Sequence, residues 1–238
     1  MTLDPSSLDR FDQKINQINE VYHDLDHAIE QFQSRSGLSC KAKCGRCCEN
    51  PYIDVTVLEM LPLVRALFDN KEVDQYWTKA SAAEFIGLFQ SKGSEDGQYN
   101  DLSSLEKRPY TNYLQSFNGA KVNKGRCVFY QPDDRIEGNG RCGVYPFRPL
   151  VCRLFGFSGK KDKTGKLKLV TCPIIKEMHK HSLDNIQKEP EQFFMPGMSD
   201  FSARISSIDP ELGRNQLPMN EAFKVAVQHV GLRLKFRE

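Results

Sequence analysis

Residues 40–48 read CKAKCGRCC, which places four thiols within nine residues. The residues between them include Lys41, Lys43, Gly45 and Arg46, and these leave no apolar face through which the segment could pack as buried cysteines do. Closely spaced thiols in a reducing compartment are typical of metal ligands. We therefore interpret this stretch as the nucleus of a metal site. A disulfide framework and redox-active thiols are the alternatives.

The other four cysteines all lie downstream of this loop. Two short strands on either side of a polar turn are predicted to bring Cys127 and Cys142 together, and Pro149 can open a helical turn that presents Cys152. The predicted metal ligands are Cys40, Cys44, Cys47, Cys48, Cys127, Cys142, Cys152 and Cys172. Eight thiolates are enough for two centres of four.

Within the loop, the vicinal pair Cys47 and Cys48 is expected to diverge, with Cys48 turned toward a second centre. Glycines at 45 and 143 are expected to let the backbone turn closely around a sulfur. One division of the ligands joins Cys40, Cys44, Cys47 and Cys152 in one centre and Cys48, Cys127, Cys142 and Cys172 in the other.

Basic residues are concentrated around the cysteines. Residues 121–180 carry fourteen Lys or Arg against five Asp or Glu, although the whole chain has a net charge of only +2. Positive neighbours lower the pKa of a thiol and favour the ligating form. The bases next to a cysteine are Lys41, Lys43, Arg46, Arg126, Arg141 and Arg153. We interpret this block as compensating thiolates and covering a hairpin tip rather than as a nucleic-acid surface.

The spacing of the cysteines favours an iron–sulfur cluster over zinc. Structural zinc sites usually combine two CxxC pairs, and this chain has one, Cys44 with Cys47. Cys172 is followed by Pro173, as in the Cys-Pro that ends ferredoxin-type cluster motifs. Zinc is the alternative that this pattern also allows.

The remaining patterns predict a mainly α protein with small β-hairpins. Apolar residues at steps of three and four predict a long amphipathic helix over 7–33, which packs on its own domain or forms a homodimer. Thr56 and Glu59 match a capping box, with Pro62 either at a kink or in the true first turn. Further helices are predicted over 74–90, 174–186 and 221–236, the last with Asn220 as its N-cap. A surface loop is predicted over 93–105, a hairpin with a basic tip at 159–168, and loops with short helical turns over 190–219.

These elements are expected to form one compact domain over 1–238, with the N-terminal helix in 1–36, a cysteine-cluster core in 40–173 and a helical wrap in 174–238. The N-terminus lacks the features of a secretory signal, and no segment has the length and apolarity of a membrane span. The expected location is therefore the cytoplasm. His23 and His27, four residues apart, are expected to be ordinary surface histidines.

The CKAKCGRCC loop, the segment VYPFRPLVCRLF at 144–155 and the pair Cys172-Pro173 occur in an order that resembles the YkgJ-type cysteine-cluster family, whose CxxxCxxCC domain is associated with zinc or iron chelation. The resemblance spans about residues 40–173 and implies metal chelation. A related pattern in flagellin lysine-N-methylases implies methylation that depends on S-adenosylmethionine. The spacing of Cys40, Cys44 and Cys47 is also similar to that of radical S-adenosylmethionine enzymes, but no alternating strand and helix series follows it here.

Three functions follow as hypotheses. The first is a cytoplasmic metalloprotein whose eight cysteines hold an iron–sulfur cluster or zinc. The second is a methylase or other transferase that uses an iron–sulfur centre, in which Arg148 or Arg153 binds an anionic group and Tyr130 or Tyr145 lies near the site. The third is a structural zinc protein that binds a partner through the long helix or the basic hairpin.

Overall fold

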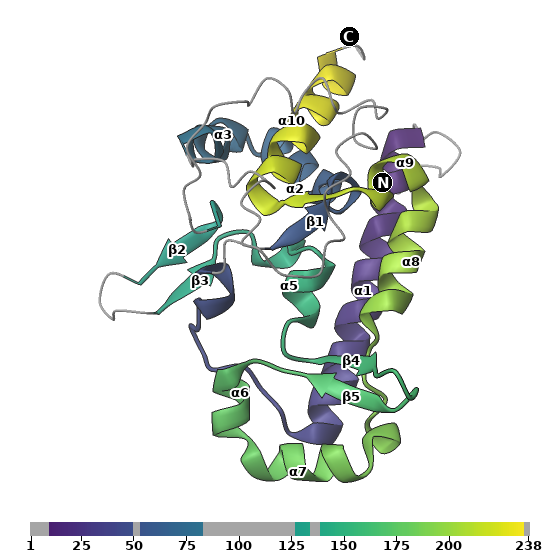
Figure 1. Ribbon diagram of the computed structural model, residues 1–238. Helices are drawn as coiled ribbons and strands as arrows, with labels where there is room; N and C mark the ends of the chain where they lie inside the picture. The colour runs from purple at the N-terminus through teal and green to yellow at the C-terminus, as the bar shows by residue number, and fades with distance from the viewer. Residues whose placement is uncertain (1–9, 50–52, 83–126, 134–138, 236–238) are drawn as a thin grey trace, which may run out of the picture.

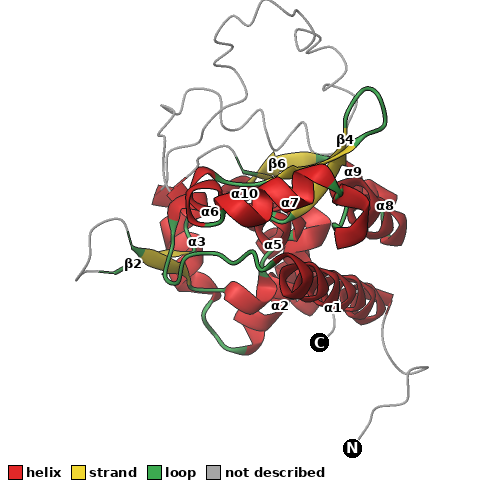
Figure 2. Ribbon diagram, turned by 90° about the horizontal axis from the view of Figure 1, so that it is seen from below, coloured by secondary structure: helices red, strands yellow, loops and turns green. Residues whose placement is uncertain are grey.

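The computed structural model describes residues 10–49, 53–82, 127–133 and 139–235. Helices make up most of these residues, as expected for a mainly α protein (Figures 1 and 2). The α-helices are α1 (Arg10–Ser36), α2 (Val57–Asp69), α3 (Val73–Ala82), α5 (Leu150–Leu154), α6 (Pro173–Met178), α7 (Lys180–Lys188), α8 (Met198–Ile208), α9 (Pro210–Arg214) and α10 (Met219–Lys235). The 3₁₀ turns are η2 (Arg46–Glu49), η4 (Tyr145–Phe147) and η5 (Pro190–Phe193).

The described strands form three antiparallel pairs. They join β1 (Asp54–Thr56) to β6 (Gln216–Pro218), β2 (Tyr130–Pro132) to β3 (Gly140–Cys142), and β4 (Ser158–Lys161) to β5 (Leu167–Val170). Val55 pairs with Leu217, so the chain that leaves the cysteine loop lies beside its C-terminal part. The two hairpins expected around the cysteines and at the basic tip are confirmed.

Helix α1 confirms the long amphipathic helix. Its apolar stripe is buried inside the molecule and packs against α2, α5 and α8, so the stripe is used within this chain. The buried members that the pattern predicted are Phe11, Ile15, Ile18, Tyr22, Leu25, Ile29 and Phe32. The helix stops at Gly37, which has φ +68° and donates its N–H to the carbonyl of Gln33 at 2.8 Å. A homodimer through this helix stays a prediction.

Helix α2 confirms the capping box. The Thr56 hydroxyl accepts from the backbone N–H of Glu59 at 3.2 Å, and the Glu59 carboxylate accepts from the N–H of Thr56 at 2.8 Å. Pro62 lies inside the helix, which excludes the first turn as its place. The second carboxylate oxygen of Glu59 accepts from the N–H of Leu150 at 2.9 Å. A buried carboxylate therefore joins the start of α2 to the start of α5, the helix that carries Cys152.

Helix α10 packs mainly on α2 and brings Phe223 and Val230 into the core. It begins at Met219, so Asn220 is not its cap as expected. The Asn220 side chain instead accepts a hydrogen bond from the N–H of Val128 at 3.2 Å. This contact fixes the strand that follows Cys127 to the C-terminal helix.

Two helix predictions need correction. The helix expected over 174–186 is two helices, α6 and α7, separated at His179, whose φ of −127° and ψ of 39° are not helical. The segment 190–219 contains α8, an eleven-residue helix rather than short turns, and α8 buries Ile205 while it packs along α1 (Figure 1). Much of the helix expected over 74–90, the loop over 93–105 and Arg126 lie outside the described residues. No described helix is long and apolar enough to cross a bilayer.

Candidate metal centre

The cysteine loop is anchored where it leaves α1. Leu38 is 1% exposed and holds the chain in the core, and Ser39 then contacts the ring of His179. The Nε2 atom of His179 lies 3.4 Å from the N–H of Ser39 and 3.3 Å from its hydroxyl oxygen. Because His179 ends α6, this contact holds the chain just before Cys40 beside α6 (Figure 1).

The middle of the loop is tied to the hairpin β2–β3. Lys43 has a positive φ of 58°, which is uncommon for a residue other than glycine, and its carbonyl accepts from the N–H of Gly140 at 3.0 Å. Cys44 forms an antiparallel bridge with Asn139. The hairpin therefore fixes the conformation of the loop at the position of Cys44.

Tyr130 explains the glycines around this junction. A Cβ added to Gly45 would lie 2.2 Å from Cε2 of Tyr130, and one added to Gly140 would lie 2.4 Å from the same atom. The ring thus fits between two backbone segments, and its hydroxyl donates to the carbonyl of Asn139 at 3.0 Å. Gly143 meets the side chain of Gln131 in the same way. The expectation that these glycines make room for a sulfur is therefore corrected: they make room for side chains of strand β2.

The hairpin also positions two thiols. The N–H of Cys127 donates to the carbonyl of Cys48 at 3.1 Å, so the strand segment begins against the vicinal pair. Cys142 pairs with Tyr130 in the ladder, and the N–H of Gly143 donates to the carbonyl of Phe129 at 2.8 Å. These contacts confirm that the two strands bring Cys127 and Cys142 together.

The last two cysteines lie on short helices. Cys152 is in α5, and its N–H donates to the carbonyl of Pro149 at 3.0 Å, as expected for a helical turn opened by that proline. Cys172 is the N-cap of α6, and its sulfur accepts from the N–H of Ile175 at 3.4 Å. Pro173 occupies the first position of the helix, where its missing N–H costs nothing.

The electrostatic neighbours of Cys40 define a first group of thiols. Desolvation raises the pKa of Cys40 to about 11, and Cys44, Cys172 and Cys47 add to the shift. We call Cys40, Cys44 and Cys172 the loop-side group. The group joins Cys40 and Cys44 of the loop to Cys172 at the start of α6. The contact between Ser39 and His179 agrees with this, because His179 lies at the end of the same helix.

A second group lies around the hairpin. Burial raises the pKa of Cys127 to about 12 and that of Cys152 well above its ordinary value. The neighbouring thiols Cys127 and Cys142 also raise the pKa of both Cys48 and Cys152. We call Cys48, Cys127, Cys142 and Cys152 the hairpin-side group. Cys47 raises the pKa of Cys40 in the loop-side group and of every thiol in the hairpin-side group, so it lies between the two.

This arrangement differs from the division expected from spacing. Cys152 lies with the hairpin-side thiols and Cys172 with Cys40, so the two have exchanged places. The reason is topological, because α5 starts from the Glu59 carboxylate beside the hairpin, whereas α6 lies next to the end of α1.

The vicinal cysteines interact with each other rather than diverging as expected. A hydrogen bond from Cys48 to the sulfur of Cys47 lowers the pKa of Cys47 to about 6, and it raises the pKa of Cys48. The charge of Arg148 contributes to the lowered pKa of Cys47. Of the two thiols, Cys47 is the one whose pKa is lowered, which favours its ligating form.

Arg148 is the cation whose charge reaches several thiols, since it lowers the pKa of Cys47, Cys142 and Cys152. Its guanidinium carbon lies 3.5 Å above the ring centroid of Tyr145, and it donates to the carbonyl of Cys152 at 3.3 Å. Tyr145 itself is 58% exposed. The half-buried Arg148 and the exposed Tyr145 thus form a pair beside the hairpin-side group.

The bases adjacent to cysteines in the sequence have a different place. Lys41, Lys43 and Arg46 are exposed, and Arg141 donates to the side chain of Gln131. None of these four is among the main causes of the described thiol pKa shifts. Adjacency in sequence therefore failed to identify the cation that acts on the thiols.

Arg153 has a role in packing. It is only 5% exposed, its guanidinium lies 4.4 Å above the ring centroid of Tyr22, and it pairs with Asp26 of α1. It also donates to the carbonyls of Arg148, at 2.6 Å, and Pro146. The sequence suggested that Arg153 binds an anionic group, but its donors are engaged by these contacts. Arg153 instead joins α5 to α1.

The donor set suits a thiophilic metal. All eight cysteines are free thiols, and they come from the loop, the hairpin and two helices. Among the described residues, however, no three Cys, His, Asp or Glu side chains are arranged to hold a metal ion. The thiols are gathered into neighbouring groups, and a metal would have to draw them closer, as in sites whose binding is coupled to folding.

Comparison with known proteins gives one match. A family model named CxxCxxCC, with the description "Putative zinc- or iron-chelating domain", matches residues 39–173. Neither a curated protein nor a solved structure matches the chain. The matched range begins at Ser39 and ends at Pro173, and so it contains all eight cysteines.

Proposed function

Because this chain belongs to the CxxCxxCC family, we propose that it binds metal through its eight thiols in two centres of four. The first centre uses the loop-side group together with Cys47, and the second uses the hairpin-side group. The observation that carries the proposal is the backbone geometry around the thiols. The N–H of Cys127 donates to the carbonyl of Cys48 at 3.1 Å beside the β2–β3 pair, whereas the contact between Ser39 and His179 holds the chain before Cys40 beside the helix that Cys172 caps. The pair Cys47 and Cys48 supplies one ligand to each centre.

An iron–sulfur cluster is the favoured occupant. The loop-side centre would combine Cys40, Cys44 and Cys47 from one short loop with the distant Cys172, which Pro173 follows, and this resembles the ligand arrangement of ferredoxin-type clusters. When bound, such a cluster would supply one-electron chemistry. Arg148, at the edge of the hairpin-side group, would offset part of the negative charge that four thiolates leave.

Structural zinc is the second candidate. The proposed ligands of the hairpin-side centre come from η2 and from the segment 127–152, which contains the hairpin β2–β3 and α5 and is far from η2 in the sequence. A closed zinc centre would cross-link these segments and stabilise the fold directly. Either metal needs reduced thiols as ligands, so the proposed location is a reducing compartment such as the cytoplasm.

Metal analysis with an optical spectrum separates the two occupants. Protein purified without oxygen should be brown, with about four irons and four sulfides for each cluster. Colourless protein that contains zinc and no iron would exclude the cluster and leave the zinc centre. Protein without any bound metal, prepared with iron and zinc in the growth medium, would contradict both.

A further inference from the structure

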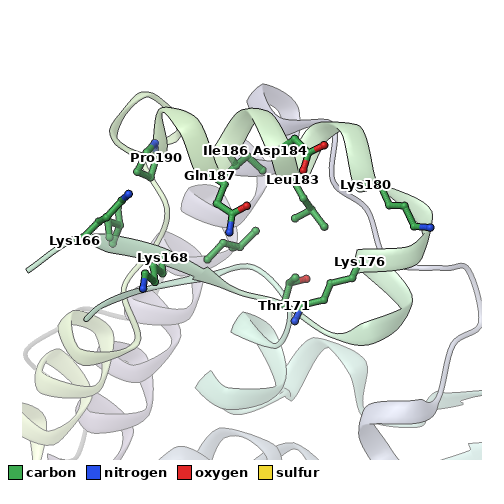
Figure 3. A pocket seen from close by; sticks show the side chains of 12 residues that line it. Lys166, Lys168, Thr171, Lys176, Lys180, Leu183, Asp184, Ile186, Gln187 and Pro190 are labelled. Carbon is green, nitrogen blue, oxygen red and sulfur yellow. The ribbon is translucent and has the colours of Figure 1, made fainter. Parts of the chain in front are cut away.

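A pocket of about 570 Å³ lies between strand β5 and the helices α6 and α7 (Figure 3). This volume is in the range of sites for small molecules. Thr171, which precedes Cys172, is part of its lining. The pocket contains none of the proposed metal ligands, so it is distinct from the metal centres.

The polar part of the pocket is strongly cationic. Lys166 and Lys168 lie on one side and Lys176 and Lys180 on the other, whereas Asp184 is the one acidic residue of the lining (Figure 3). Lys168 forms an ion pair with Asp162, outside the pocket, at 3.0 Å. In the described part of the chain, the other three lysines have no ion-pair partner. Their ammonium groups are therefore free to meet an anion.

The rest of the lining is aliphatic. Leu167 and Leu169 alternate along one face of β5, and Leu183 and Ile186 come from α7. The lining contains no Phe, Tyr or Trp side chain. A nucleobase would therefore lack the aromatic surface on which bases usually stack in proteins.

The cationic lining also disfavours a positively charged ligand. A sulfonium or a lysine ammonium would meet the three lysines without an ion-pair partner in the described residues, against the one carboxylate of the lining. A molecule that combines a carboxylate or phosphate with an aliphatic chain satisfies both parts of the wall, because the head pairs with the lysines and the chain covers the leucines.

We propose that this pocket binds a small amphiphile with an anionic head and an aliphatic chain. The lysines of α6 and α7 bind the head group, and Leu183 and Ile186 bind the chain. Because Cys172 is the N-cap of α6, an occupant of the pocket would contact the helix that this proposed metal ligand caps.

Decanoate, at concentrations below micelle formation, is the probe, and its binding to the full-length protein is measured by isothermal titration calorimetry. Decanol of the same chain length and butanoate of the same charge should each bind at least about tenfold more weakly, because each lacks one of the two contacts. Equal binding of decanol would overturn the role of the lysines. Equal binding of butanoate would overturn the role of the aliphatic wall. These comparisons need no variant.

The double variant Lys176→Gln with Lys180→Gln should weaken decanoate binding about tenfold through loss of two charged contacts. Lys160→Gln with Lys163→Gln is the matched control, because it removes two exposed charges of the nearby hairpin that lie outside the lining. Equal weakening by the control would show a general charge effect and contradict the pocket. Binding to anionic phosphatidylglycerol vesicles without binding to free decanoate would also contradict it, since the lysines would then act as a membrane surface.

Discussion

The ring of Tyr130 occupies the space beside the backbone of Gly45, where an added Cβ would lie 2.2 Å from Cε2 of the ring. Tyr130 of strand β2 therefore packs directly against the backbone of the cysteine loop. The loop therefore depends on the hairpin for its conformation, and metal binding should depend on both.

Replacing Gly45 with Ala should destabilise the protein by about 1–3 kcal/mol, because a methyl group cannot share this space with the ring. Urea unfolding measures the loss. In a protein that carries Tyr130→Ala the ring is absent, so adding Gly45→Ala should cost much less. An equal cost in both backgrounds would show that the ring is not what excludes the side chain.

Replacing Arg153 with Met should destabilise the fold by about 1–3 kcal/mol, since the carbonyls of Arg148 and Pro146 would lose their donor. Asp26→Asn should cost less, because Asp26 is 45% exposed and can be solvated. Chemical denaturation compares the two variants. A variant Arg153→Met with unchanged stability would contradict the packing role.

Replacing His179 with Ala should loosen the start of the cysteine loop, because Ser39 loses its contact with the ring. Bound metal should then be lost about fivefold faster to a chelator, the equivalent of about one hydrogen bond. The matched control is His181→Ala, on the exposed side of α7, which should leave the rate unchanged. Equal rates of metal loss in both variants would show that the contact between His179 and Ser39 does not hold the cysteine loop.

Glu59 should make stability depend on pH. Burial raises its pKa in the folded protein above the ordinary value of 4.5, so its contribution is fully present below that value and is lost as the pH rises through the raised pKa. The free energy of unfolding of the wild type, minus that of Glu59→Gln, should therefore fall as the pH increases from about 4.5. A difference that rises with pH would contradict the direction of the shift.

Local patterns were sufficient for much of the fold. The spacing of apolar residues predicted α1, and Thr56 with Glu59 predicted the start of α2, since both depend on neighbours within one or two turns. The break between α6 and α7 was missed, because His179 meets Ser39, a residue 140 positions away. Asn220 was mistaken for a cap for a similar reason, since its partner is Val128.

The site shows the same limit. The eight cysteines could be found from the sequence, but their grouping could not, because it depends on which face of the fold α5 and α6 reach. Lys41, Lys43, Arg46 and Arg141 were the wrong cations to choose. Arg148 reaches the thiols from the turn that precedes α5. Glycines 45 and 143 did mark close contacts, but the sequence does not reveal that they face the side chains of Tyr130 and Gln131.

The most direct test is the metal content of cysteine variants purified without oxygen. Cys172→Ser and Cys152→Ser should each remove about half of the bound metal, and the two together should remove all of it, because they belong to different centres. Cys40→Ser combined with Cys172→Ser should remove no more than Cys172→Ser alone. If that pair abolishes metal binding while Cys152→Ser with Cys172→Ser leaves half of it, the proposed division of the thiols is wrong.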